Sequence, residues 1–372
     1  MKILFVLENY IPHIGGVEVV FKNLAEGLVN KQHEVSIVTH RIKGTKKYEE
    51  INGVKVYRVE SLGSRHVFTF SSIPLVIKLA RESDIIHTTT YNAAFPAKIA
   101  SYFTKKPSII TVHEALGDLW SKTGISYVGS LILRLLESLI LRLNFDHYVT
   151  VSNSTKGQVL GFNINESKVT TIYNGVDYRL WNPKKYDKFL RKDLGLKDNF
   201  VIFFYGRPGF SKGLEFLIKA LPKVFEKIPN AKFFGLVSRD KAYKKRFDYI
   251  VSLVNKLGIT DKCIFHPSVK FSELPKYVAM SNVVVVPSLT EGFGFAAAES
   301  CAMDKIVVAS NTTSLPEVVS GKYNLIETGN SNSIAEGIIK AYNRKYTKTS
   351  KKRFLLRENI RKYEDLYDQI KQ

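Results

Sequence analysis

Short apolar runs alternate with longer amphipathic stretches along the whole chain, and this alternation restricts the fold more than any other feature. The runs are rich in β-branched residues and predict two series of strands. The first series is 3–7, 34–39, 54–59, 84–88, 108–112, 148–151 and 169–172, and the second is 200–205, 231–237, 263–266, 283–287 and 306–309. Apolar strands separated by helix-length stretches are typical of parallel sheets covered by helices on both faces. The sequence therefore predicts an α/β protein with two doubly wound, Rossmann-like domains.

The chain of 372 residues is long enough for two such domains. A polar segment, 178–199, contains Pro183, lacks a clear strand pattern and separates the two series. We therefore predict an N-terminal domain over 1–180 and a C-terminal domain over 181–349. The last stretch, 350–372, alternates apolar and charged residues, which predicts a terminal amphipathic helix.

The composition excludes several classes of protein. Hydrophobic residues make up 45% of the chain and only two cysteines occur, so a disordered or disulfide-stapled protein is excluded. The first apolar run is too short for a signal peptide, and charges interrupt the most hydrophobic window, 127–143. We expect a cytoplasmic protein, peripheral at most on the cytoplasmic membrane face.

Two stretches hold most of the net charge of +21. Residues 184–246 carry 17 basic and 6 acidic side chains, and residues 340–362 carry 10 basic and 1 acidic. Such an excess predicts an anionic partner, which could be nucleic acid, a phosphate-bearing ligand or an anionic membrane surface. A solvated, lysine-rich surface is the simpler alternative.

Two loops of the N-terminal domain follow strands and carry candidate site residues. Gly15 and Gly16 precede a helix over 17–30, where backbone N–H groups could approach a phosphate, although a tight turn explains the same pattern. The G-x-G-x-x-G fingerprint is absent, which disfavours a dinucleotide site. His113 follows the strand 108–112 and could donate a hydrogen bond to a substrate, or be structural.

A glycine-containing turn after the strand 200–205 carries two cations. Arg207 and Lys212 lie five residues apart in this turn, and both could be directed at one diphosphate. The full Walker pattern is absent, so an ATPase is not supported. Two solvated surface cations are the alternative.

The segment PSLTEGFGFAAAE at 287–299 follows an apolar strand and contains two carboxylates, Glu291 and Glu299. Glu299 is expected about two turns inside the helix that follows. The backbone N–H groups near the start of this helix could hold a phosphate between the carboxylates, and they belong to Phe293, Gly294 and Phe295. A helix cap with a buried ion pair is the alternative.

Patterns for other chemistries are weak or missing. The eight histidines show no paired ligand spacing and both cysteines are isolated, so no metal site is predicted. The G-x-S-x-G motif of serine hydrolases is also absent.

Five motifs occur in an order that resembles a known family. They are GGVE at 15–18, NGVD at 174–177, GRPGFSKG at 206–213, PSLTEGFGFAAAES at 287–300 and LPEVV at 315–319. Together they resemble retaining glycosyltransferases of the GT-B architecture, the glycogen-synthase-like and phosphatidylinositol-mannosyltransferase-like group of glycosyltransferase family 4. The resemblance implies two Rossmann-like domains that face each other across a cleft, with the last helix returning to the N-terminal domain.

The resemblance also implies roles for residues of the C-terminal domain. A UDP- or GDP-sugar would be the donor, and no metal or other cofactor would be required. Arg207 and Lys212 would neutralise the donor diphosphate, and Glu291 would contact the transferred sugar. Glu299 would bind the ribose, with the N–H groups of residues 293–295 nearby.

For the N-terminal domain, the resemblance implies contacts that complete the site. Gly15 and Gly16 would approach the donor phosphates, and His113 would contact the sugar near its reacting face. The anomeric configuration of the sugar would be retained.

The acceptor leaves little trace in the sequence. The apolar stretch 124–143 contains Arg134 and Arg142 and could rest at a membrane interface or form a core helix. Together with the net charge, it leads us to expect a hexose or N-acetylhexosamine transferred to a lipid-linked or membrane-surface acceptor, as in cell-envelope glycan synthesis.

Two other classes of function stay open. A sugar-nucleotide epimerase or a phosphorylase-like enzyme would have the same fold. A nucleic-acid-binding protein would explain the charge but would leave the two glutamates of segment 287–299 without a role, so no nucleic-acid partner is expected.

Overall fold

The computed structural model describes residues 1–372 except 14, 62–63, 123, 187–188 and 372. The chain divides into two compact units. Unit 1 comprises Met1–Ser121, Ile125–Gly175 and Phe354–Gln372, and unit 2 comprises Lys122–Gly124 and Val176–Arg353. The main chain thus enters unit 2 at 175/176 and leaves it at 353/354, whereas the sequence analysis placed these points at 180/181 and 349/350.

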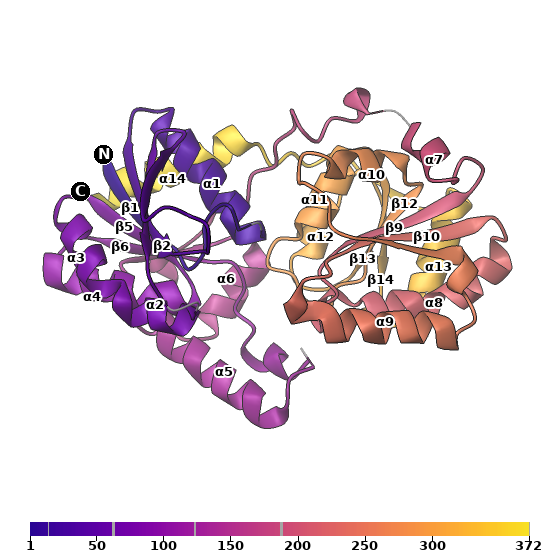
Figure 1. The fold of residues 1–372 in the computed structure, drawn as a ribbon, viewed down its shortest axis with the longest axis horizontal. Helices are drawn as coiled ribbons and strands as arrows, with labels where there is room; N and C mark the ends of the chain where they lie inside the picture. The colour runs from indigo at the N-terminus through magenta and orange to yellow at the C-terminus, as the bar shows by residue number, and fades with distance from the viewer. Residues whose placement is uncertain (14, 62–63, 123, 187–188, 372) are drawn as a thin grey trace. The chain divides into compact units, whose positions relative to one another are not determined.

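Unit 1 is built on an eight-stranded sheet with the order β3-β4-β2-β1-β5-β6-β7-β8 (Figure 1). The strands are β1 (Lys2–Val6), β2 (Glu34–His40), β3 (Tyr48–Ile51), β4 (Val54–Val59), β5 (Ile85–Thr89), β6 (Ser108–Val112), β7 (His147–Thr150) and β8 (Val169–Thr171). The helices are α1 (Gly16–Val29), α2 (Arg65–Ser71), α3 (Ile73–Arg81), α4 (Ala94–Thr104), α5 (Tyr127–Leu141), α6 (Asn153–Leu160) and α14 (Leu356–Lys371). Helices α1 and α14 cover one face of the sheet, and α2, α3 and α4 cover the other.

Unit 2 is built on a seven-stranded sheet with the order β11-β10-β9-β12-β13-β14-β15. The strands are β9 (Phe200–Gly206), β10 (Ala231–Val237), β11 (Cys263–His266), β12 (Val283–Val286), β13 (Ile306–Ser310), β14 (Lys322–Ile326) and β15 (Thr347–Lys348). The helices are α7 (Phe189–Asp193), α8 (Leu214–Lys227), α9 (Lys244–Lys256), α10 (Leu274–Met280), α11 (Phe295–Ala302), α12 (Leu315–Val318) and α13 (Ser331–Tyr342).

The predicted α/β fold with two doubly wound sheets is confirmed. Each strand predicted from the sequence is present, with its ends shifted by at most one residue. Three strands were missed, namely β3, β14 and β15, which lie at or next to a sheet edge. Their side chains are partly exposed, so they lack the continuous apolar pattern of a central strand. The expectation of purely parallel sheets is wrong at these edges, because β3 pairs antiparallel with β4 and β15 with β14.

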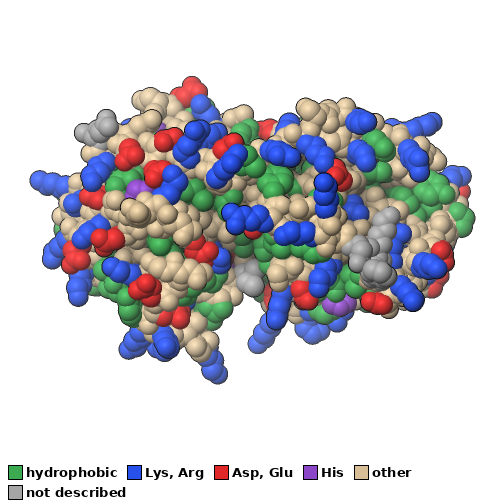
Figure 2. Space-filling view, turned by 90° about the horizontal axis from the view of Figure 1, so that it is seen from above, with side chains coloured by type: hydrophobic (Ala, Val, Ile, Leu, Met, Phe, Trp, Pro, Cys, Tyr) green, Lys and Arg blue, Asp and Glu red, His purple; other side chains and the backbone are tan. Residues whose placement is uncertain are grey.

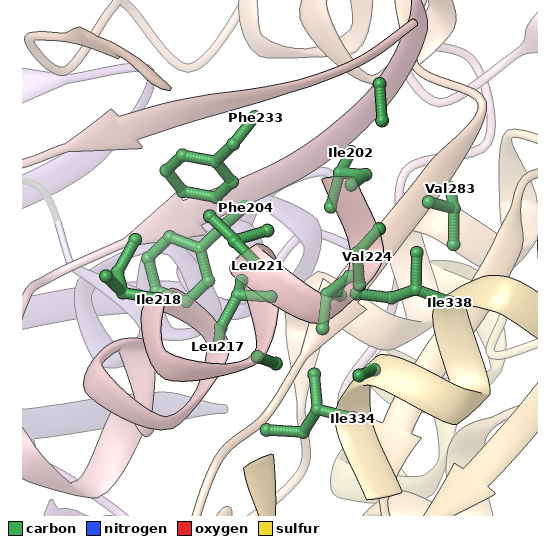
Figure 3. Close-up of a cluster of buried hydrophobic side chains, with 14 of the residues drawn as sticks. Ile202, Phe204, Leu217, Ile218, Leu221, Val224, Phe233, Val283, Ile334 and Ile338 are labelled. Atoms are coloured by element: carbon green, nitrogen blue, oxygen red, sulfur yellow. The ribbon is translucent and has the colours of Figure 1, made fainter. Parts of the chain in front are cut away.

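The core of unit 2 fixes the strand that leads into the candidate site. Leu217 and Leu221 of α8 and Ile334 and Ile338 of α13 are four residues apart on their helices, so each pair lies on one helix face. These side chains are buried against Ile202 of β9 (Figure 3). The packing holds β9, and therefore the turn at its carboxyl end, against two helices.

Helix α14 is tied to the sheet of unit 1 by buried hydrogen bonds. The ring of His87 in β5 contacts the Tyr367 hydroxyl through Nδ1 (2.5 Å) and the Thr111 hydroxyl through Nε2 (2.8 Å). The Tyr363 hydroxyl lies 3.2 Å from the same Thr111 oxygen. These groups connect β5, β6 and α14, so the end of the chain is an integral part of unit 1.

Acidification is expected to destabilise the protein through His87. Burial lowers the pKa of His87 from 6.5 to about 3. The unfolded chain takes up a proton below pH 6.5 and the folded chain does not, so the unfolded state is favoured as the pH falls. This site should cost about 3 kcal/mol of unfolding free energy between about pH 7 and about pH 4. Chemical denaturation across this range should give a flatter pH dependence for His87→Gln than for wild type, whereas exposed His66→Gln should leave the slope unchanged.

Helix α5 exposes its apolar residues to solvent. The exposed side chains are Ile125, Tyr127, Val128, Leu131, Ile132, Leu135, Leu136 and Leu139. Ser130, Glu137 and Leu141 are its buried residues. The core-helix interpretation of 124–143 is therefore wrong, because most of the apolar side chains do not face the core. Among the described helices, none is long and apolar enough to cross a membrane.

The basic side chains of the described residues are dispersed on the surface seen in Figure 2. They are interspersed with acidic side chains rather than gathered along one groove on this face. Several belong to ion pairs within unit 2, such as Lys244–Asp248 and Arg246–Glu215. This distribution gives no support to the continuous basic groove that nucleic acid would need.

Candidate active site

The candidate site of unit 2 lies at the carboxyl ends of two neighbouring parallel strands. Strand β9 pairs with β12, so the loops that follow them meet at one edge of the sheet. Lys212 ends the 3₁₀ turn Phe210–Lys212 after β9, and its Nζ lies 2.7 Å from Oε1 of Glu291 in the loop after β12. The Ser288 hydroxyl donates to the same carboxylate oxygen over 2.8 Å. The structure thus brings together two residues predicted from separate motifs.

The ion pair is partly shielded from water. The Lys212 side chain is 28% exposed and that of Glu291 is 12% exposed. Two further contacts fix the backbone of Glu291, because its N–H donates to the Thr313 hydroxyl and its carbonyl accepts from the Ser314 hydroxyl, both over 2.9 Å. The carboxylate is therefore held by the loop after β13 as well as by its own loop.

Gly213 allows the close approach of the two loops. Its backbone has a φ of +65°, and a Cβ atom at this position would lie 1.9 Å from the carbonyl oxygen of Pro287. Because that contact is with backbone, a side chain here would push the Lys212 turn away from the Glu291 loop.

Gly213→Ala is therefore expected to lower the free energy of unfolding by at least about 2 kcal/mol. Gly195→Ala is the matched control, because Gly195 has a φ of +66° and a Cβ there would meet nothing within 4 Å. Chemical denaturation of both variants isolates the clash from the backbone strain. Equal losses in the two variants would contradict the close approach.

Glu299 is buried beneath the same loop. Helix α11 begins at Phe295, so Glu299 lies about one turn inside the helix rather than the two expected. Its carboxyl group is 4% exposed and accepts a hydrogen bond from the Tyr205 hydroxyl over 2.9 Å. Burial raises the pKa of Glu299 to about 8, so its carboxyl group is mainly protonated at neutral pH.

The predicted phosphate-binding N–H groups lie at the start of α11. Gly294 is the residue that precedes the helix, and its φ of +89° is one that glycine adopts readily. Phe293 is buried and its ring meets that of Phe295 edge-on, with centroids 5.1 Å apart. The helix start thus presents its backbone rather than large polar side chains.

Arg207 is exposed and lies outside the Lys212–Glu291 contact. Its Nη1 donates to the Tyr243 hydroxyl over 3.2 Å, and the guanidinium lies 5.8 Å from the centre of that ring. Tyr243 is neutral, so the charge of Arg207 stays uncompensated in this contact.

Three predicted site residues belong to unit 1. Gly15 precedes α1 and Gly16 begins it. A Cβ at Gly15 would lie 2.4 Å from Oε2 of Glu18, which is buried and accepts a hydrogen bond from His13 over 3.0 Å. A carboxylate therefore lies beside the proposed phosphate approach, which the motif alone did not indicate.

His113 at the end of β6 is a neutral, partly buried histidine. Burial lowers its pKa to about 4, so the ring is uncharged at physiological pH. Its Nε2 is buried and has no hydrogen-bond partner among the described residues. The ring packs edge-on against Phe21, with centroids 5.9 Å apart. A ring nitrogen without a protein partner is suited to bind a substrate hydroxyl.

Sequence reasoning missed several groups that shape the site. Ser288, Thr313 and Ser314 hold Glu291, and Tyr205 and Tyr243 hold Glu299 and Arg207. The available signal was their position, since most follow directly on predicted strands of unit 2. Within the described ranges, no group of three or more His, Cys, Asp or Glu side chains is placed to hold a metal ion.

Two family models match the chain in succession. The model described as Glycosyltransferase Family 4 matches residues 14–180, and the one described as Glycosyl transferases group 1 matches residues 187–363. An uncharacterised glycosyltransferase of Methanocaldococcus jannaschii is 33% identical over 362 residues, covering 91% of this chain and 88% of that protein. The capsular polysaccharide biosynthesis glycosyltransferase CapM of Staphylococcus aureus is 26% identical over 334 residues, covering 86% and 83%. A human protein of the phosphatidylinositol N-acetylglucosaminyltransferase is 25% identical over 354 residues, covering 91% and 68%.

A solved structure shares the fold over nearly the whole length. The crystal structure of HepE from Anabaena, in complex with UDP and glucose, has a TM-score of 0.82 at 20% identity. The alignment covers 99% of this chain and 100% of that chain. The predicted GT-B fold is therefore confirmed.

Proposed function

The chain belongs to glycosyltransferase family 4, and from that premise we propose that it transfers a hexose or N-acetylhexosamine from a nucleoside diphosphate sugar. The proposal includes retention of the anomeric configuration and no requirement for a metal ion. The observation that carries it is the contact between Lys212 and Glu291 at the carboxyl edge of the unit 2 sheet. A cation beside a carboxylate offers one group for a phosphate and another for sugar hydroxyls.

The chemistry asks the protein to stabilise a leaving nucleoside diphosphate. Negative charge grows on the diphosphate as the bond to the sugar breaks, and fixed cations stabilise that charge more than they stabilise the ground state. Lys212, the uncompensated Arg207 and the N-terminus of α11 are the groups that we assign to this role. The UDP bound in the Anabaena structure supports a donor of this class.

Other residues are assigned to the remaining parts of the donor. Glu291 would accept hydrogen bonds from hydroxyls of the transferred sugar. The protonated carboxyl group of Glu299 would both donate to and accept from the ribose. In unit 1, the uncharged His113 would bind a sugar hydroxyl through Nε2, and Gly15 and Gly16 would bring backbone close to the phosphates.

We further propose a lipid-linked or membrane-surface acceptor, with the enzyme peripheral on the cytoplasmic membrane face. The support is the exposed apolar surface of α5 in a chain of net charge +21. The human relative belongs by name to a phosphatidylinositol N-acetylglucosaminyltransferase, which agrees with an acceptor of this kind.

A transfer assay tests this function. The protein is incubated with radiolabelled UDP-glucose, UDP-N-acetylglucosamine or GDP-mannose and with vesicles that contain phosphatidylinositol or polyprenyl phosphate, in the presence of EDTA. Label is expected in the organic extract, and NMR of the product should show the donor's anomeric configuration. Transfer that requires a divalent cation, or a product with inverted configuration, would contradict the proposal.

Arg207→Ala is expected to weaken binding of the free nucleoside diphosphate about tenfold, because a charge-assisted hydrogen bond to phosphate is lost. Calorimetric titration with UDP and GDP measures this loss. Lys227→Ala is the control, since Lys227 is an exposed cation at the far end of α8. An unchanged affinity in Arg207→Ala would remove Arg207 from the diphosphate site.

A further inference from the structure

Unit 1 contains a cavity of about 390 Å³ that no predicted role uses. Its walls are the segment 115–119, helix α5 and helix α6. Arg134, Ser138 and Arg142 of α5 and Gly157 of α6 are among the lining residues. The segment 115–119 begins two residues after His113, so the cavity is connected in sequence to a residue of the proposed active site.

Two stripes run side by side along α5. Arg134, Ser138 and Arg142 are spaced by four residues and therefore share the helix face that borders the cavity. Leu131, Leu135 and Leu139 have the same spacing, are 47%, 61% and 56% exposed, and lie on an adjacent face. A basic, cavity-lining stripe thus lies next to an apolar, solvent-exposed one.

The polar groups of the cavity favour an anion. Arg134 pairs with Asp118, which also lines the cavity. Arg142 is exposed and has no carboxylate partner among the described residues. Gln158 accepts from the Ala115 N–H through Oε1 (3.4 Å), which leaves its amide N–H groups as donors. The cavity therefore combines one uncompensated cation with neutral donors.

The wall formed by segment 115–119 is held in place by Glu137. Its carboxylate oxygens accept from the Leu116 N–H (2.9 Å) and the Gly117 N–H (2.7 Å), and also from the Trp120 ring N–H (3.2 Å). Glu137 is buried on the side of α5 that faces this segment. The cavity is therefore defined by fixed backbone and not by long surface side chains alone.

We propose that this cavity binds the phosphate group of an anionic lipid, whose hydrocarbon chain lies along the exposed leucines of α5. The inference rests on the proposed function and names the class of its acceptor. Arg142 and the Gln158 amide hold the phosphate, and the apolar stripe removes the first part of the chain from water. A cation beside an apolar surface matches an amphiphile with a charged head better than a soluble anion or a neutral lipid.

Calorimetric titration of the full chain with dodecyl phosphate, below its micelle concentration, tests the site. Inorganic phosphate and octyl glucoside serve as the anion without a chain and the chain without an anion. Dodecyl phosphate is expected to bind at least about tenfold more tightly than either. Arg142→Gln should weaken dodecyl phosphate about tenfold and leave octyl glucoside unchanged.

A second variant fills the cavity without disturbing the fold. A Cβ at Gly157 would meet nothing within 4 Å, and the residue lies inside α6, so leucine fits the backbone there. Gly157→Leu should weaken dodecyl phosphate by the same factor as Arg142→Gln, whereas Gly157→Ala should bind it like wild type.

Two results would overturn the proposal. One is dodecyl phosphate binding that neither Arg142→Gln nor Gly157→Leu changes. The other is inorganic phosphate that binds as tightly as dodecyl phosphate, which would assign the cavity to a soluble anion. Thermal shifts with UDP- and GDP-sugars separate this site from the donor site. If the shifts persist in both variants while dodecyl phosphate fails to bind, the lipid site alone is wrong; if dodecyl phosphate binds and no donor shifts wild type, the donor assignment alone is wrong.

Discussion

Glu291→Gln is expected to lower the rate of sugar transfer by about a thousandfold and to leave the unfolding transition nearly unchanged. The substitution keeps the size of the side chain and its hydrogen bond from Ser288, but it removes the negative charge beside Lys212. A carboxylate is the stronger acceptor for sugar hydroxyls, and its charge also balances the lysine before the donor binds.

The rate is measured under single-turnover conditions with the donor that the transfer assay identifies. Glu336→Gln is the matched control, since Glu336 lies on α13 and forms an exposed ion pair with Lys223. Circular dichroism during thermal unfolding reports whether the fold is intact. A Glu291→Gln enzyme that retains more than about a tenth of the wild-type rate would take Glu291 out of the sugar site.

Lys212→Met is expected to reduce transfer by a similar factor, because the departing diphosphate loses its nearest fixed cation. Methionine keeps much of the apolar stem of lysine, so the packing of the turn is retained. The variant also leaves the 12%-exposed Glu291 carboxylate without its ion-pair partner, which should cost about 1 kcal/mol of stability. Lys227→Met, at the other end of α8, is the control.

The double variant Lys212→Met/Glu291→Gln separates catalysis from structure. If the two groups act together on one donor, the combined loss of rate will be clearly smaller than the product of the single losses. The double variant should also recover the stability lost in Lys212→Met, because no unpaired carboxylate remains. Multiplicative losses would show that the two residues act at separate places.

The strand series, the fold class and the Lys212–Glu291 pair could all be predicted from the sequence. Each depends on a local pattern, because apolar runs identify strands and parallel strands bring their following loops to one edge. The missed edge strand β3 has no such pattern, since half of its side chains face solvent. The depth of Glu299 in α11 was overestimated because the glycines that delay the helix start were counted as helical.

The surroundings of the site residues were beyond sequence reasoning. The contact of Thr313 with the Glu291 backbone joins residues 22 positions apart in the chain, and no periodicity reports such a pairing. The exposure of α5 was equally hidden. Its sequence is apolar on nearly every side, and such a helix is as typical of a core as of a surface until its neighbours are known.

Differential scanning fluorimetry with a panel of UDP-, GDP- and ADP-sugars tests most directly whether unit 2 holds a nucleotide sugar through Lys212 and Glu291. A ligand that binds the native state at about 100 times its dissociation constant stabilises it by about 2.7 kcal/mol. We predict that one donor raises the melting temperature of wild type by about 5 °C and leaves that of Lys212→Met unchanged. A panel in which no donor shifts wild type, or in which the shift persists in Lys212→Met, would contradict the account.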